Sequence, residues 1–232
     1  MNLIKRNWLS FAALIGAVVL SGCATRTPMA YGEGTSPLEH QTKPVYLMAV
    51  TLKNNYRKTW QPEMLVVHVE KPGAKESSER LNFTIDEPGK DETGSDVTGN
   101  RYFLRMGLDA GQYDLVGVTS LNRSFPIIGT FFTPLHSNVE AKSPGVYYLG
   151  HVRATVRERQ GNEFKAGPSI PLVDQAVVGA SGGTFDVEIL DELAEDEPAF
   201  RKRFPALEGV PIVKALLPPF DREKAQKWWE AH

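Results

Sequence analysis

Short apolar segments separated by turn residues dominate the pattern along this chain. Residues 45–52 and 64–69 are nearly continuous apolar runs rich in β-branched side chains, which is typical of strands buried on both faces or in a sandwich core. Residues 81–85 and 102–108 instead alternate apolar with polar positions, which predicts half-buried strands. Further strands are expected at residues 113–119, 125–132, 146–157 and 185–190. About eight short strands with turns between them are typical of an antiparallel sandwich or barrel, and we predict a mainly β fold, an antiparallel β-sandwich.

The strand expected at residues 146–157 carries two chemically different sets of side chains. Alternation assigns Tyr148, Val152 and their apolar neighbours to the buried face. The opposite face carries His151, Arg153 and Arg157, three groups that can hold an anionic ligand such as a phosphate or a sugar acid. The same alternation also predicts an ordinary solvated outer face of a sheet. The sequence does not decide between an anion site and a solvated outer face.

Two helices are expected near the C-terminus. In the first, Asp196 is a candidate N-cap, and Phe200 and Phe204 share one face before Pro205 ends the helix. Between the earlier strands, residues 88–100 are rich in glycine and acidic residues and predict an exposed loop.

The second helix is expected to begin after Asp221, which is a candidate N-cap with Phe220 as its hydrophobic staple. Its apolar stripe consists of Ala225, Trp228 and Trp229. Such a stripe fits a helix docked on the sandwich, although tryptophan also favours a membrane interface.

The N-terminal segment has the organisation of a secretory signal, in which Lys5 and Arg6 precede an apolar run over residues 8–20. The run is too short for a transmembrane helix, which needs about 20 apolar residues. It ends in Leu20-Ser21-Gly22-Cys23, which resembles a bacterial lipobox. The resemblance implies cleavage after residue 22, a lipid on Cys23 and a membrane anchor. Ala24 follows the cysteine in place of the aspartate that such lipoproteins carry when they stay in the inner membrane, so we expect the outer membrane, at its periplasmic face or the cell surface.

Charge and composition narrow the remaining function classes. Without residues 1–22 the chain has 24 basic and 28 acidic residues, and it shows no basic cluster, which argues against nucleic acid as a partner. With its only cysteine lipidated, no thiol remains for a disulfide. Residues 24–44 are rich in Thr, Gly, Pro and Ser and predict a flexible tether, whose roughly 20 residues reach at most about 70 Å when extended.

Two motifs carry a second resemblance. Leu108-x-Ala110-Gly111-x-Tyr113 is followed by Pro144-Gly145-Val146-Tyr147-Tyr148-Leu149-Gly150, and together they resemble uncharacterised bacterial outer-membrane lipoproteins with a transthyretin-like β-sandwich. The resemblance covers roughly residues 45–159 and implies a fold and a place in the cell envelope. It implies no catalytic residue.

Gly179-Ala180-Ser181-Gly182-Gly183 matches the G-x-S-x-G pattern of a nucleophile elbow, which would make the chain a serine hydrolase acting through Ser181. An elbow requires a helix after the serine, whereas the residues after Gly183 alternate as a strand. The only later histidine is the terminal His232. We therefore expect a flexible turn and no catalytic residue.

The sequence shows no metal-binding pattern. The histidines have no pair at i, i+2 or i, i+4, and Asp86, Asp91 and Asp96 depart from the EF-hand spacing, so we expect no metal and no cofactor. Residues 125–135 are expected to be a buried core strand, with an exposed apolar patch for a partner or lipid as the alternative.

The sequence therefore predicts four segments. They are a signal peptide (1–22), a lipidated N-terminus and tether (23–44), a β-sandwich (45–191) and a helical extension packed on it (192–232). We expect a lipid-anchored envelope protein that acts as a non-catalytic binding or structural module, bound to the membrane through Cys23 and contacting an envelope protein partner. The alternatives are the Ser181 hydrolase and a carrier of an anionic small ligand on the Arg153 face.

Overall fold

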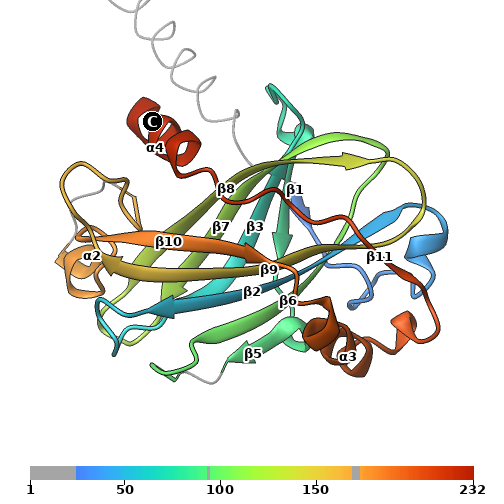
Figure 1. Cartoon of the computed structure of the whole chain (residues 1–232), viewed down its shortest axis with the longest axis horizontal. Coiled ribbons are helices and arrows are strands. Elements are labelled where there is room, and N and C mark those ends of the chain that lie inside the picture. Colours follow the sequence, from blue (N-terminus) through green and yellow to red (C-terminus); the bar gives the residue numbers. More distant parts are fainter. Residues whose placement is uncertain (1–24, 93–94, 169–172) are drawn as a thin grey trace, which may run out of the picture.

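Two β-sheets pack face to face in this protein (Figure 1). The computed structural model describes residues 25–92, 95–168 and 173–232, so the predicted signal peptide and Cys23 lie outside the described residues. Strands account for 43% of the chain and helices for 19%, which confirms the prediction of a mainly β sandwich with a short helical C-terminus.

Sheet A has five strands, and all of its neighbouring pairs are antiparallel except β1 with β4. In spatial order they are β1 (Thr25–Thr27), β4 (Arg80–Thr84), β3 (Glu63–Glu70), β7 (Gly111–Asn122) and β8 (Gly129–Ala141).

Sheet B has six strands and is mixed, because β9 runs parallel to both β2 and β11. In spatial order they are β10 (Gly183–Leu190), β9 (Gly145–Glu158), β2 (Pro44–Asn54), β6 (Asn100–Gly107) and β5 (Lys90–Glu92), with β11 (Ile212–Lys214) beside the first residues of β9. Parallel neighbours need a crossover connection, and β3, β4, β7 and β8 of sheet A lie in the chain between β2 and β9.

Helices cover the outer faces. The α-helices are α2 (Val173–Val177), α3 (Leu193–Arg203) and α4 (Arg222–Ala231), and the short 3₁₀ turns are η1 (Glu39–Gln41), η2 (Ser77–Glu79), η3 (Glu87–Gly89) and η4 (Pro205–Leu207). Helix α3 lies against sheet B and α4 against β8 of sheet A (Figure 1). As predicted, Asp221 caps α4 by accepting a hydrogen bond from the Lys224 backbone N–H at 2.9 Å. Helix α3 begins three residues before its predicted cap, which places Asp196 inside the helix.

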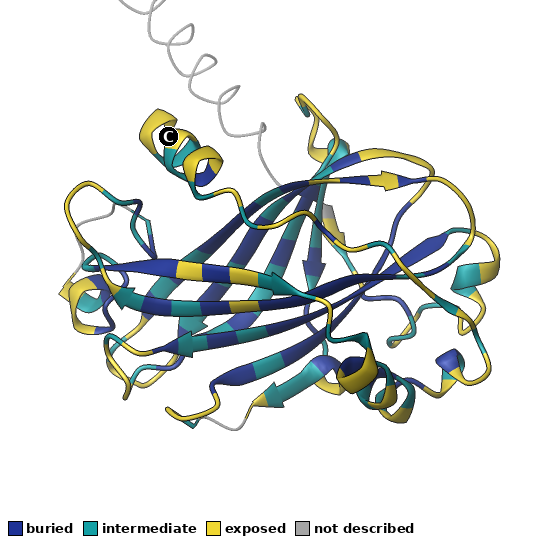
Figure 2. Cartoon of the chain, in the orientation of Figure 1, coloured by how far each residue is buried: buried dark blue, intermediate teal, exposed yellow. Residues whose placement is uncertain are grey.

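Hydrophobic side chains form two cores. The larger core lies between the sheets and includes Phe83, Phe131 and Phe185. The smaller one lies between the outer face of sheet B and α3, where Phe103 and Phe200 meet edge to face with ring centroids 5.1 Å apart. Strands β2 and β6 are therefore buried on both faces over most of their length and are mainly dark blue in Figure 2. Strand β3 buries Met64, Val67 and Val69 in the core between the sheets and leaves its other face half-buried, so it has the second of the two predicted settings, a strand in a sandwich core.

Residues 25–44 differ from the tether that their composition predicts. Strand β1 pairs with β4, and Met29 and Ala30 are only 1% exposed. Ala30 also exchanges hydrogen bonds with Arg105, since its N–H donates to the Arg105 carbonyl at 2.8 Å and its carbonyl accepts from Arg105 Nε at 2.9 Å. The segment is ordered because its few apolar side chains enter cores formed by distant strands, which composition alone does not reveal.

Arg105 is fully buried although it lies on a strand predicted to be half-buried. Its guanidinium donates to both carboxylate oxygens of Asp86, at 3.0 and 2.5 Å, and lies 3.9 Å from the ring centroid of Phe204. Burial lowers the pKa of Arg105, and the hydrogen bonds and charge of Asp86 oppose that effect.

Two further segments depart from their predictions. Residues 88–100 contain the short strand β5 and the buried Gly89, so they are not simply an exposed loop. Residues 125–135 divide in two: Phe125 is 93% and Ile128 53% exposed, whereas Phe131 and Leu135 are buried in β8. The exposed part lies in a connection at the sheet end, where no facing sheet covers it.

Candidate functional site

A β-bulge in β9 brings two polar side chains onto one face of sheet B. Leu47 pairs with Tyr148 and Ala49 with His151, so Met48 alone lies opposite both Leu149 and Gly150. Gly150 has a φ of 115°, a conformation that glycine adopts without strain. Because side chains alternate with period two, Tyr148 and His151 would point to opposite faces of a regular strand.

Because of the bulge, the side chains of this strand do not all lie on the faces that the sequence predicts. Tyr148 lies in the smaller outer core, whereas Leu149 and Val152 lie in the core between the sheets. The prediction that Tyr148 and Val152 share one face is therefore wrong, although both are fully buried. The extra residue reverses the predicted faces of residues 146–149, so Leu149 faces the core between the sheets, and the predicted faces hold only after Gly150.

Asp196 of α3 lies at the centre of the polar cluster that results. Its side chain is completely buried and accepts hydrogen bonds from the Tyr148 hydroxyl at 2.6 Å, from His151 Nδ1 at 3.2 Å and from the Arg101 guanidinium. Burial by itself would raise the pKa of Asp196, but the hydrogen bonds from His151 and Tyr148 and the nearby positive charge outweigh it and lower this pKa. Asp196 therefore stays ionised, and the pKa of Tyr148 is raised by its burial and by this carboxylate.

His151 joins the cluster to α3 and to β2. Its Nδ1 also lies 2.9 Å from a carboxylate oxygen of Glu192, and its Nε2 lies 2.8 Å from the Thr51 hydroxyl. With two carboxylates facing it, Nδ1 carries a hydrogen and donates it. The second oxygen of Glu192 accepts from Arg153 at 2.5 Å.

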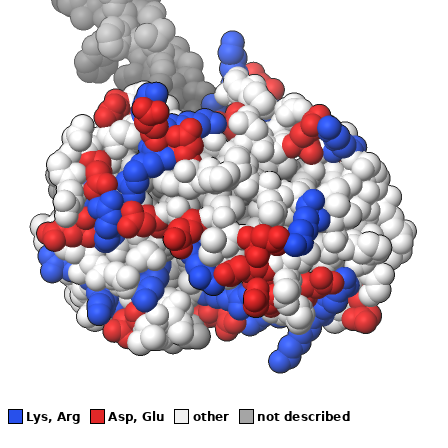
Figure 3. Space-filling model, in the orientation of Figure 1, with Lys and Arg blue, Asp and Glu red and all other residues white. Residues whose placement is uncertain are grey.

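An open cleft of about 510 Å³ lies beside this cluster. The charged side chains lining it are Lys53, Arg101, His151, Arg153, Glu192 and Glu195. Its size is within the range of small-molecule sites. Acidic and basic side chains are mixed on this face of the molecule (Figure 3). The cleft is likewise lined by side chains of both charges.

Arg157 lies away from the cleft, although the sequence places it on the same face as His151 and Arg153. Its guanidinium contacts Glu163 at 2.6 Å and Asp186 at 2.9 Å. These contacts raise the pKa of Arg157, and mainly the Arg157 hydrogen bond lowers that of Glu163 to about 2. The structure therefore brings His151 and Arg153 together and holds Arg157 in a separate ion-pair network.

Sequence reasoning missed four members of the cluster: Tyr148, Asp196, Arg101 and Glu192. One signal for Asp196 was available, because it precedes the apolar Phe200 by four residues and so lies on the same face of the helix. No local signal links these residues to His151.

Ser181 lies in the turn between α2 and β10, and its backbone N–H donates to the Gln175 carbonyl at 3.1 Å. The chain continues into strand β10 at Gly183, as the sequence predicts, instead of the helix of a nucleophile elbow. Among the described residues, no hydrogen bond joins the Ser181 hydroxyl to a histidine.

The aspartates considered as calcium ligands and the tryptophan considered for a membrane interface also lie outside the cleft. Asp86 pairs with Arg105 and Asp91 with Arg203, and within the described ranges no group of three histidine, cysteine or carboxylate side chains is arranged to hold a metal ion. Trp228 packs on the sandwich, stacked on Phe132 with ring centroids 5.4 Å apart.

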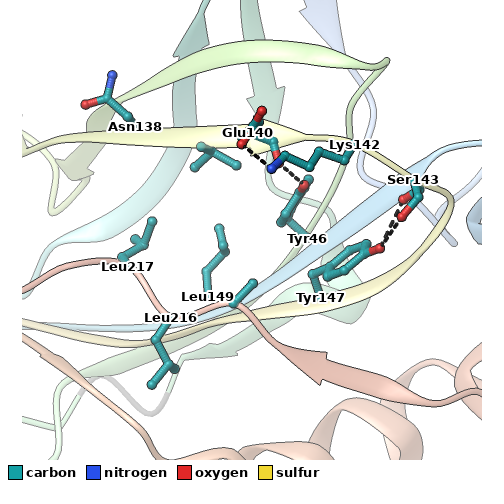
Figure 4. Close-up of a pocket in the computed structure, with 11 residues that line it drawn as sticks. Tyr46, Asn138, Glu140, Lys142, Ser143, Tyr147, Leu149, Leu216 and Leu217 are labelled. Carbon is teal, nitrogen blue, oxygen red and sulfur yellow. Dashed lines mark hydrogen bonds and ion pairs between the residues drawn. The ribbon is translucent and has the colours of Figure 1, made fainter.

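A smaller hollow of about 290 Å³ lies at the open edge between β8 and β9 (Figure 4). The rings of Tyr46 and Tyr147 stack there with centroids 5.4 Å apart. The Tyr46 hydroxyl donates to the Glu140 carbonyl at 2.9 Å, and the Tyr147 hydroxyl lies 2.9 Å from that of Ser143. Since these hydroxyls already have partners within the protein, the hollow offers a ligand fewer polar contacts than the sheet B cleft.

Comparison with known proteins returns no relative: no family model, no curated protein and no solved structure matches the chain. Across the described residues, none of the helices is long and apolar enough to cross a membrane.

Proposed function

We propose that this chain is a lipid-anchored outer-membrane protein that acts as a non-catalytic binding module of the cell envelope. The observation that carries the proposal is the Leu20-Ser21-Gly22-Cys23 segment, directly followed by a folded sandwich that begins at Thr25. Two or more acyl chains give stable membrane anchoring without a transmembrane helix. An envelope protein is the expected partner.

Mass spectrometry of the mature amino terminus tests the anchor. We expect an acylated Cys23 in the wild type, and we expect Cys23→Ser to release the protein from membranes or to block its maturation. An unmodified wild-type terminus, or a processed Cys23→Ser protein that stays in the membrane fraction, would contradict the proposal.

A second candidate, binding of a small anionic ligand, is favoured by one observation in the sheet B cleft. Lys53 lines the cleft and forms no ion pair within the described part of the chain, and the Arg153 side chain is 49% exposed. Two cations that reach solvent from one strand pair can hold a phosphate or carboxylate group.

Inorganic phosphate is a suitable probe for this candidate. We expect phosphate to shift the NMR signals of the His151 ring and the Arg153 side chain in a saturable way. Arg153→Ala should weaken binding at least tenfold, whereas Lys142→Ala, an exposed change outside the cleft, should not. Equal affinity in the wild type and Arg153→Ala would eliminate the cleft as an anion site.

A further inference from the structure

Strand β1 fixes where the N-terminal lipid would meet the folded domain. Thr25, Arg26 and Thr27 pair in parallel with Leu81, Asn82 and Phe83. Only Ala24 separates Cys23 from Thr25, and two peptide units reach about 8 Å at most. The lipid-bearing residue therefore lies within about 8 Å of the start of β1, rather than at the end of a long tether.

The direction of β1 identifies the end of the sandwich concerned. Because β1 runs parallel to β4, the chain enters sheet A at the end where β4 begins, next to the connection between β3 and β4. This connection, residues 71–79, projects beyond the strands of sheet A at this end (Figure 1, teal, top) and contacts β1 through η2. We call residues 71–79 the β3–β4 hairpin loop.

The β3–β4 hairpin loop holds a defined shape. Lys71 N–H donates to the Glu79 carbonyl at 2.9 Å, and Arg80 donates to the Ala74 carbonyl at 3.0 Å. The Glu79 carboxylate accepts from the backbone N–H groups of Lys75 and Glu76 at 2.9 and 3.0 Å, and these bonds lower its pKa. The loop therefore keeps a fixed position relative to β1.

The chemistry of the loop suits a phospholipid surface. Lys71 and Lys75 are exposed, and neither is held in an ion pair within 4 Å by any described residue. Lysines next to a membrane gain roughly 1 kcal/mol each from anionic headgroups. The loop also carries Glu76 and Glu79, so its charges balance, and its place at the membrane rests on the short link between Cys23 and β1.

We propose that the β3–β4 hairpin loop and the start of β1 lie against the phospholipid headgroups of the membrane that holds the lipid anchor. This inference rests on the proposed lipidation of Cys23. The opposite end of sheet A, with the exposed Phe125, then points away from that membrane, because β3 alone spans about 23 Å between the two ends. The domain sits directly on the bilayer, and its Phe125 end points into the aqueous compartment on that side of the membrane.

Two matched cysteine variants test this orientation. Lipidation consumes the only native cysteine, so an introduced cysteine is the single free thiol. Ser78→Cys labels the β3–β4 hairpin loop, and Ser124→Cys labels the opposite end with the same chemistry at an exposed serine. Each full-length lipidated variant carries a fluorophore and is placed in phosphatidylethanolamine–phosphatidylglycerol vesicles that contain a headgroup spin label.

We expect the spin label to quench the fluorophore at residue 78 at least threefold more than the one at residue 124. A 20-residue Gly-Ser insertion between Ala24 and Thr25, which adds a mean reach of about 25 Å, should remove the difference. Equal quenching at both sites in a protein whose terminus carries the acyl mass would overturn the orientation alone. Absence of the acyl mass would overturn the lipid anchor and this inference together.

Discussion

The two C-terminal helices dock on the sandwich by different physical means. Helix α3 inserts the buried carboxylate of Asp196 into a set of donors on sheet B, next to the aromatic contact of Phe200 with Phe103. Helix α4 stacks Trp228 on Phe132 and near His136, with ring centroids 5.4 and 4.9 Å apart. Its hydrogen bonds to the sandwich, such as that from Arg222 to the Phe185 carbonyl at 2.6 Å, involve side chains that are partly exposed, so none of them leaves a fully buried charge.

The two modes of docking differ in how much stability is lost when one contact is removed. A buried carboxylate requires every one of its donors in place, since an unpaired buried charge costs several kcal/mol. Stacked rings tolerate small shifts, because their attraction is spread over many weak atomic contacts. We therefore expect α3 to be held in one position and α4 to adjust, and three predictions test this contrast.

The largest effect is expected for Asp196→Ala. This change leaves Arg101 and the Tyr148 hydroxyl without their buried partner, and it should lower the free energy of unfolding by about 3 kcal/mol. Denaturant melts measure the loss. The matched control is Asp221→Ala, which removes an aspartate from the start of α4 and should cost about 1 kcal/mol as a lost N-cap. Similar losses in both variants would mean that the cluster does not hold α3.

A smaller effect is expected for Trp228→Ala, which removes the stacking on Phe132 and the contact with His136. The ring is half-buried, so we expect a loss of about 2 kcal/mol in the free energy of unfolding. Hydrogen exchange should show faster opening of α4 while the amides of α3 stay protected. Faster exchange in α3 as well would show that the two helices are coupled.

The smallest effect is a difference in acid sensitivity. Burial, with the charges of Lys224 and His232, lowers the pKa of His136 from 6.5 to about 4. Below pH 6.5 the unfolded state takes up the proton first, so stability falls as the pH drops from about 6.5 to 4. The lowered pKa of Asp196 acts in a different window, because the stability from its charge is lost only below about pH 4.

His136→Asn tests this assignment, because asparagine tolerates the positive φ of 47° at this position and does not titrate. Between pH 7 and 5 the variant should lose about 1 kcal/mol less stability than the wild type. The pKa of His68 is also lowered by burial, so part of the loss should remain in the variant. An unchanged pH dependence would remove His136 as its source.

The sequence by itself determined the features that depend on neighbouring residues. Apolar runs and period-two alternation predicted the longer strands but not the three-residue strands β1, β5 and β11. Asp221 was recognised as the cap of α4 because a cap contacts a backbone N–H only three residues away. The strand that follows Gly183 was likewise predictable from its own alternation.

Only the tertiary structure decided the cleft and the position of the N-terminal segment. Asp196 meets Arg101, Tyr148 and His151 across separations of 95, 48 and 45 residues, and no local pattern records such pairings. An isolated glycine in a strand, such as Gly150, can mark a bulge, but only the pairing of β9 with β2 shows that this one does and which side chains then face α3. Residues 25–30 are ordered through β4 and Arg105, because a polar segment becomes fixed when a completed sheet supplies its hydrogen-bond partners.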